Sequence, residues 1–143
     1  MAEFAIHPQL LADTHYLGRL PASHLLLHRN ASVPWFILVP ETGWTDLLDV
    51  PDESREIIMR EAAAVSDFIK RALYYHKINF AAIGNVVPQL HLHIVGRAED
   101  DACWPAPVWG NLSAAREYSG PELKQLRQRL REFLGNRFSE RRE

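Results

Sequence analysis

Residues 89–95 read QLHLHIV, and the fold is best interpreted outward from this stretch. Alternate residues of a β-strand point to opposite faces of its sheet. The two leucines and the isoleucine therefore share one apolar face, which predicts packing on a core. Gln89, His91 and His93 share the opposite face, and Arg97 lies beyond them if the strand continues that far. The stretch thus predicts a strand that presents two imidazoles and an amide in a row.

The sequence on both sides of this strand predicts four further strands and two helices. Apolar residues spaced three and four apart, such as Ile58, Val65 and Ile69, predict a long amphipathic helix. Ser119 and Glu122 form an S-x-x-E capping box, which predicts the start of a C-terminal helix. The expected strands cover 15–20, 24–29, 35–39 and 77–84, and the expected helices cover 52–74 and 119–135. This order is typical of a single α+β domain over 1–143, with a five-stranded, mostly antiparallel sheet.

Composition narrows the class of protein further. The formal net charge is −2, so no basic field predicts a nucleic-acid partner. The single cysteine excludes an internal disulfide, which suits a reducing compartment. The N-terminal residues lack the pattern of a signal peptide, and no apolar run is long enough for a membrane span. We therefore expect a cytoplasmic protein that binds neither membranes nor nucleic-acid polymers.

Three interpretations of His91 and His93 compete. The two residues can simply lie on the outer face of a half-exposed strand. They can bind one metal ion, for which His15, His24, His28 or Glu41 would have to supply a third ligand. Alternatively, one neutral imidazole can be a nucleophile, provided that its second nitrogen is held by a hydrogen-bond acceptor.

The residues just upstream favour the nucleophile. Gly84 and Asn85 form a turn whose backbone N–H groups can hold an oxyanion. Arg97 is a further candidate to contact a phosphate. Trp104 and Trp109 are candidates to cover a purine base, although packing in a core or an interface is the more common role of tryptophan. A glycine-containing turn that leads into a row of histidines suits phosphate chemistry better than metal chelation.

The same residues resemble the signature of the histidine triad (HIT) family, His-x-His-x-His-x-x with x apolar. This sequence departs from the signature only at the first histidine, which is Gln89. The resemblance extends over most of the chain: PWFILVP, a long helix, KINFAAIGN, the histidine row and Trp-Pro follow in the family's order. The Gln-x-His-x-His pattern is similar to that of a bacterial branch of the family.

The resemblance implies a HIT-like fold that commonly dimerises by joining two five-stranded sheets. It also implies a nucleotide-binding hydrolase or nucleotidyl transferase that acts at the α-phosphate of dinucleoside polyphosphates or nucleoside phosphoramidates. By analogy with the family, His91 attacks phosphorus and becomes nucleotidylated, and His93 contacts the phosphate. No metal cofactor is intrinsic to such proteins, although magnesium accompanies some polyphosphate substrates.

Further roles follow from the resemblance position by position. Asn85 falls where many members have a glutamine that contacts phosphate, and Asn30 lies near the residue that binds ribose. Trp35 stands where several members have a further histidine. Gln89 can orient a neighbour but cannot titrate. A nucleotide-binding sensor or regulatory module with little or no catalysis is therefore the alternative prediction.

Overall fold

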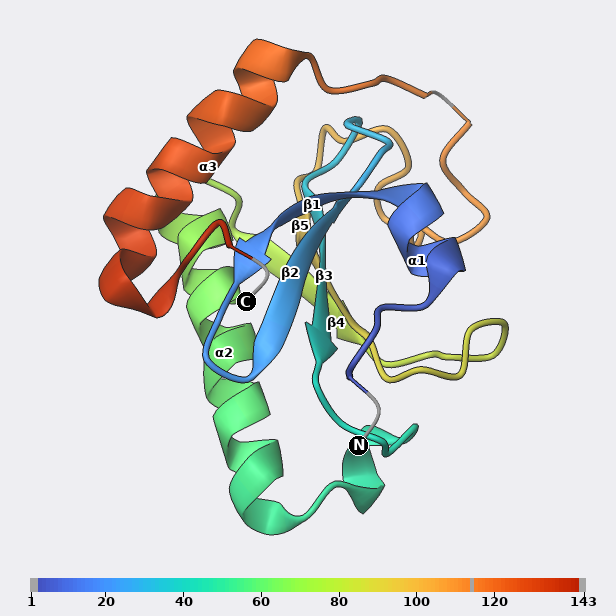
Figure 1. Cartoon of the computed structure of the whole chain (residues 1–143). Coiled ribbons are helices and arrows are strands. Elements are labelled where there is room, and N and C mark those ends of the chain that lie inside the picture. The colour runs from blue at the N-terminus through green and yellow to red at the C-terminus, as the bar shows by residue number, and fades with distance from the viewer. Residues whose placement is uncertain (1–2, 114, 142–143) are drawn as a thin grey trace.

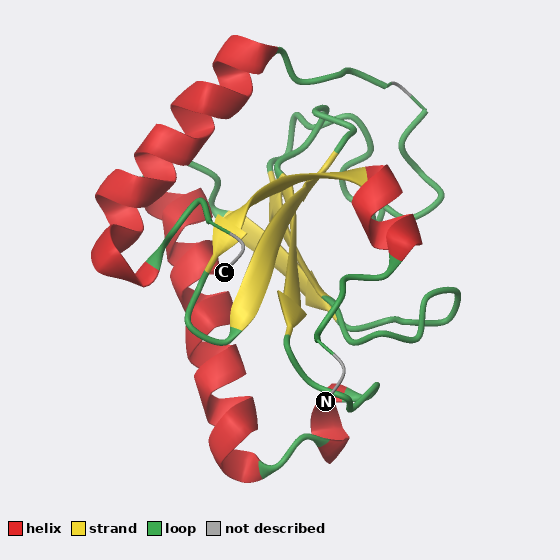
Figure 2. Ribbon diagram, in the orientation of Figure 1, coloured by secondary structure: helices red, strands yellow, loops and turns green. Residues whose placement is uncertain are grey.

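The computed structural model describes residues 3–113 and 115–141 as one sheet with helices on both of its faces (Figures 1 and 2). The five strands are β1 (Thr14–Arg19), β2 (Ser23–His28), β3 (Trp35–Pro40), β4 (Lys77–Ala81) and β5 (Leu92–Arg97). They lie in the order β1-β2-β3-β5-β4, and every neighbouring pair is antiparallel. The predicted α+β fold with a five-stranded sheet is therefore confirmed.

Two long helices cover one face of the sheet, as Figure 1 shows. They are α2 (Asp52–Arg71) and α3 (Gly120–Leu134). Ser119 and Glu122 form the predicted capping box at the start of α3. α2 ends at Arg71 rather than at the predicted residue 74, because the chain turns at Tyr74, whose φ is 64°. The core on this side joins the helices to β2, β3 and β5 through Leu27, Phe36, Leu92, Ile94, Val65, Phe68, Ile69, Leu130 and Leu134.

The opposite face of the sheet is also covered, which the sequence did not predict. A short helix, α1 (Pro8–Asp13), lies on this face (Figure 1). Residues from the N-terminal segment and from the loops after β4 and β5 join it in a second apolar cluster. The members of this cluster are Ile6, Leu10, Leu26, Val33, Trp35, Ile37, Val39, Val87, Val95 and Val108. Burial on both faces explains why β3 is a continuous apolar run and why β2 carries three consecutive leucines rather than an alternating pattern.

The histidine strand also begins later than predicted. β5 starts at Leu92, so Gln89 and His91 lie in the irregular segment that leads into it. Two short 3-10 helices complete the fold, Leu47–Asp49 before α2 and Gly135–Arg137 after α3. No helix in the described part of the chain is long and apolar enough to cross a membrane.

Candidate active site

A cleft of about 380 Å³ lies on the α1 side of the sheet, at the N-terminal end of β5. The predicted residues Gly84, Asn85, His91 and His93 all line it. Gly84 adopts a φ of 66°, which a glycine reaches without strain, so it can form the predicted turn above the histidines. The remaining lining residues are Gln9, Leu10, Asp13, His28, Trp35, Ile37, Ile83, Val86, Val87 and Trp109.

Both histidines are largely buried, with 7% of each residue exposed. The interpretation as a half-exposed outer face is therefore wrong, because α1 and the loops cover this side of the sheet. The two rings are close, with their centroids 5.0 Å apart and their planes nearly perpendicular. Buried polar groups require hydrogen-bond partners, and those partners fix the state of each ring.

His91 is held by its own chain. Its Nδ1 atom lies 2.7 Å from the backbone carbonyl oxygen of Gln89. A carbonyl oxygen only accepts, so Nδ1 carries the proton and donates it. In the neutral ring the lone pair is consequently on Nε2. This is the arrangement that a nucleophilic imidazole requires.

His93 is held in the opposite way. The indole Nε1–H of Trp35 donates to Nδ1 of His93 over 3.0 Å. An indole nitrogen only donates, so Nδ1 of His93 is unprotonated and Nε2 carries the proton. Burial, followed by repulsion from His91 and His28, lowers the pKa of His93 to about 4. His93 is therefore neutral near pH 7 and presents one N–H donor.

An aromatic wall continues from His93 across the cleft. The His28 ring stacks on Trp35 at a centroid distance of 4.1 Å. Trp109 meets Trp35 edge-on at 5.5 Å and His93 at 5.1 Å. Trp109, which the sequence left as a candidate to cover a base, thus lies in the cleft, whereas Trp104 does not line it.

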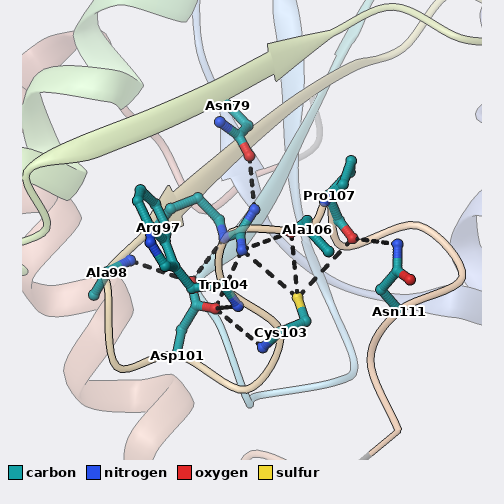
Figure 3. A network of polar contacts seen from close by, with 9 residues as sticks. All are labelled: Asn79, Arg97, Ala98, Asp101, Cys103, Trp104, Ala106, Pro107 and Asn111. Atoms are coloured by element: carbon teal, nitrogen blue, oxygen red, sulfur yellow. Dashed lines mark hydrogen bonds and ion pairs between the residues drawn. The ribbon is translucent and has the colours of Figure 1, made fainter.

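Arg97 does not reach this cleft. It lies four residues beyond His93 along β5, which corresponds to roughly 13 Å. Its guanidinium is buried and binds both carboxylate oxygens of Asp101, the Asn79 side chain and the Ala106 carbonyl oxygen (Figure 3). The prediction that Arg97 contacts phosphate is therefore replaced by a structural role.

The network around Arg97 fixes the loop that carries Trp109. Asp101 also accepts hydrogen bonds from the backbone N–H groups of Ala98, Cys103 and Trp104 (Figure 3). Burial alone would raise the pKa of Asp101, but the hydrogen bonds from Arg97 and the backbone outweigh it and lower the pKa to about 2. The carboxylate thus stays charged and holds the loop to the end of β5.

Gln89 points its side chain away from the histidines. Its Oε1 atom accepts from the backbone N–H of His7 at 2.8 Å, and its Nε2 atom donates to the carbonyl oxygen of Ala5 at 2.9 Å. The expected row of three polar side chains is therefore reduced to two, because β5 has not yet begun at residue 89. Gln89 instead contacts the candidate nucleophile His91 through its backbone carbonyl oxygen.

Asn30, the predicted ribose contact, does not line the cleft. Its side-chain oxygen accepts from the backbone N–H and the hydroxyl of Ser32, which stabilises the turn between β2 and β3. The carboxylate in the cleft is instead Asp13, at the end of α1, and Gln9 donates to it over 3.0 Å. Pro8 could have predicted α1, and with it the position of Asp13, because proline is favoured in the first turn of a helix.

His91 also lines a second cavity, of about 490 Å³, on the side of β4. Asp46 and Asp49 contribute two carboxylates to it, and none of its described lining residues is a lysine or arginine. The other lining residues are Thr45, Leu47, Leu48, Phe80, Ala81, Ala82, Ile83, Gly84 and Leu90. Neither cavity supplies a metal site: no group of three His, Cys, Asp or Glu side chains in the described ranges could hold a metal ion.

A cleft that holds two imidazoles in opposite tautomers at the end of an antiparallel sheet suggests a histidine triad domain, and the comparisons bear this out. The family model described as HIT domain matches residues 9–100. The chain therefore belongs to the histidine triad family. A search of curated proteins found no match.

Solved structures agree with this assignment. A histidine triad protein from Bradyrhizobium japonicum is 36% identical, with a TM-score of 0.83 over 90% of this chain and 96% of that one. One from Marinobacter aquaeolei VT8 is 34% identical, with a TM-score of 0.87 over 95% and 99% of the two chains. A hypothetical histidine triad nucleotide-binding protein from Sulfolobus tokodaii is 18% identical, with a TM-score of 0.62 over 86% and 85%, and shows likeness of fold.

Proposed function

We propose that this HIT protein is a nucleotide hydrolase or nucleotidyl transferase in which His91 attacks the α-phosphate of a nucleoside phosphate derivative. The observation that carries the proposal is the hydrogen bond from His91 Nδ1 to the Gln89 carbonyl, which leaves the Nε2 lone pair free. The neighbouring His93 presents an N–H donor to the same cleft. A nucleophile beside a fixed donor suits transfer of a nucleotidyl group through a covalent intermediate.

The proposed reaction has two steps. In the first, the Nε2 lone pair of His91 forms a bond to phosphorus while the bond to the leaving group breaks and its electron pair departs with that group. A leaving nitrogen takes a proton from water, whereas a leaving phosphate departs as an anion. In the second, water adds to phosphorus, the bond to His91 breaks with return of the pair to Nε2, and the proton of the water passes to solvent. An alcohol or phosphate in place of water makes the protein a transferase.

His93 acts in these steps as a neutral hydrogen-bond donor rather than as an acid. Its Nδ1 is occupied by the indole N–H of Trp35, and its pKa is lowered to about 4. Loss of the Nε2 proton from a neutral ring would leave an imidazolate, so this proton stays in place. It can bind a phosphate oxygen as negative charge builds on it. Gly84 and Asn85, across the cleft, can supply further donors.

The nucleoside fits the aromatic side of the cleft. Trp109 offers an apolar ring for a purine base, and Asp13 offers a carboxylate that can accept hydrogen bonds from ribose hydroxyls. The leaving group then occupies the second cavity beyond His91. Asp46 and Asp49 there favour a neutral or cationic leaving group over a polyphosphate. Magnesium would accompany a polyphosphate substrate to offset this repulsion, and no resident metal is required.

The test is release of nucleoside monophosphate from adenosine 5′-phosphoramidate, diadenosine tetraphosphate and their guanosine counterparts, with and without a chelator. We expect turnover that His91→Ala abolishes and that the chelator leaves intact for the phosphoramidates. Acid-labile radiolabel on the protein after reaction with substrate labelled at the α-phosphate would identify the covalent intermediate. Equal nucleotide binding by wild type and His91→Ala, with turnover in neither, would replace catalysis with the sensor role.

We also propose that the protein is a homodimer. β4 is an edge of the sheet, and Phe80 on it is 42% exposed. An edge strand has unpaired backbone groups, which pairing with a second copy would satisfy. Sedimentation equilibrium should give twice the chain mass for wild type and a lower mass for Phe80→Asp. A cytoplasmic location and membership of the branch with Gln-x-His-x-His remain predictions.

A further inference from the structure

The side chain of Gln89 joins the active site to the N-terminal segment. Its amide binds the carbonyl oxygen of Ala5 and the backbone N–H of His7, which precede it by 84 and 82 residues. An amide supplies one acceptor and two donors and does not titrate, so it can hold both backbone groups at once over a wide pH range. Through its backbone carbonyl the same residue holds Nδ1 of His91.

The segment held in this way continues directly into α1. His7 is the N-cap of the helix, and its Nδ1 atom accepts from the backbone N–H of Gln9. The helix has six residues, whereas isolated helices shorter than about 12 residues are marginal in water. α1 therefore depends on tertiary contacts for its position. Leu10 packs in the second apolar cluster, and the Gln89 amide anchors the chain just before the helix.

α1 in turn forms one wall of the candidate nucleotide cleft. Gln9, Leu10 and Asp13 line it, and Gln9 donates to the Asp13 carboxylate. Gln89 therefore contacts both the nucleophile and the segment before this wall. Its backbone carbonyl orients His91, and its side-chain amide anchors the chain that leads into α1. A shift of α1 would move Asp13 without moving the His91 ring.

We propose that Gln89 is a positioning residue whose amide clamps residues 5–7, and through them α1, against the nucleoside side of the cleft. This inference rests on the proposed nucleotide binding. It gives the glutamine at the first triad position a side-chain task distinct from the chemistry. Any residue at 89 supplies the carbonyl for His91, but an alanine there releases the N-terminal segment.

Point variants of the full chain test the clamp. Gln89→Ala removes both side-chain bonds, and Gln128→Ala, on the exposed side of α3, is the matched control. His7→Pro removes the backbone N–H that donates a hydrogen bond to Oε1 of Gln89, and the φ of −54° at His7 already suits proline. His7→Pro also removes the ring that caps α1, so His7→Ala, which keeps the N–H, is its reference.

The readouts are the Kd for adenosine 5′-monophosphate by calorimetry and the kinetics with adenosine 5′-phosphoramidate. We expect Gln89→Ala to raise the Kd and KM about tenfold, the loss typical of one or two modest hydrogen bonds. The value of kcat should change less than about threefold, because the backbone carbonyl behind His91 remains. His7→Pro should raise the Kd about threefold over His7→Ala, and this difference between the two His7 variants should vanish in a Gln89→Ala background.

An unchanged Kd in Gln89→Ala, or a fall in kcat with a constant KM, would overturn the clamp. A threefold difference between His7→Pro and His7→Ala that persists in the Gln89→Ala background would overturn it as well, because independent actions multiply and a shared one does not. Either result leaves the proposed function in place when wild type releases adenosine 5′-monophosphate from the phosphoramidate. A wild type that binds neither compound would overturn the proposed function and the clamp together.

Discussion

The indole N–H of Trp35 donates a hydrogen bond to Nδ1 of His93, whereas Nδ1–H of His91 donates one to the Gln89 carbonyl. The two imidazoles therefore hold opposite tautomers. Their ring centroids are 5.0 Å apart. One ring offers a lone pair on Nε2 and the other offers a proton on Nε2. Neither tautomer depends on the side chain at residue 89, which explains how a triad can lose its first histidine and keep this arrangement.

The tautomers can be observed directly by two-bond ¹H–¹⁵N correlation of the imidazole rings at pH 7. We expect His91 to show a protonated Nδ1 and His93 a protonated Nε2. Trp35→Phe removes the donor to His93 and should shift that ring toward a mixture of tautomers, while His91 stays as it is. A His91 ring protonated at Nε2 in wild type would contradict the proposed nucleophile.

The low pKa of His93 links folding to pH. Its pKa is about 4 in the folded protein and about 6.5 in the unfolded chain, so the unfolded chain binds the extra proton first as the pH falls. Above pH 6.5 the linkage has no effect, and between pH 6.5 and 4 the folded state loses roughly 3 kcal/mol. Urea unfolding at pH 7 and pH 4.5 should show most of this loss in wild type and a smaller loss in His93→Gln. Equal losses in the two proteins would contradict the low pKa.

Asp101 is expected to be essential for the loop that carries Trp109. Asp101→Asn leaves the guanidinium of Arg97 buried beside a neutral amide, and breaking a buried ion pair costs about 3 to 5 kcal/mol. Urea unfolding measures this cost, and tryptophan fluorescence should report a changed environment of the loop that carries Trp104 and Trp109. The neighbouring Asp100 is exposed, so Asp100→Asn is the matched control and should change the stability little. A stable Asp101→Asn protein would show that the pair is dispensable.

Gly96 permits the close approach of α2 to β5. A Cβ atom there would lie 2.7 Å from Cγ2 of Ile69 and 2.7 Å from Cγ of Pro34. Gly96→Ala should therefore lower the free energy of unfolding by about 1 to 3 kcal/mol, as overpacking of a core does. Gly43 has no atom within 4 Å of the same position, so Gly43→Ala is the control. Equal thermal midpoints for the two variants would refute the contact.

The local patterns in the chain were sufficient for much of the fold. The alternation in QLHLHIV correctly predicted that Leu92 and Ile94 pack on the core, and the S-x-x-E pattern located the start of α3. Such signals are short-range, because side-chain direction in a strand and hydrogen bonding at a helix end depend on a few neighbouring residues. The same patterns predicted His91 and His93 as the central pair of the site.

Contacts between distant residues decided the rest. Asp13 enters the cleft because α1 packs on the sheet, and a six-residue helix gives little periodic signal of its own. The Asn79 side chain on the neighbouring strand helps to hold Arg97 away from the site, and Gln89 binds the N-terminal segment rather than the histidines.

By itself, the sequence thus determined the kind of sheet, the two long helices and the pair of imidazoles. Only the tertiary structure decided which nitrogen of each ring carries the proton. That choice depends on a carbonyl and an indole N–H within about 3 Å, and the indole belongs to a different strand.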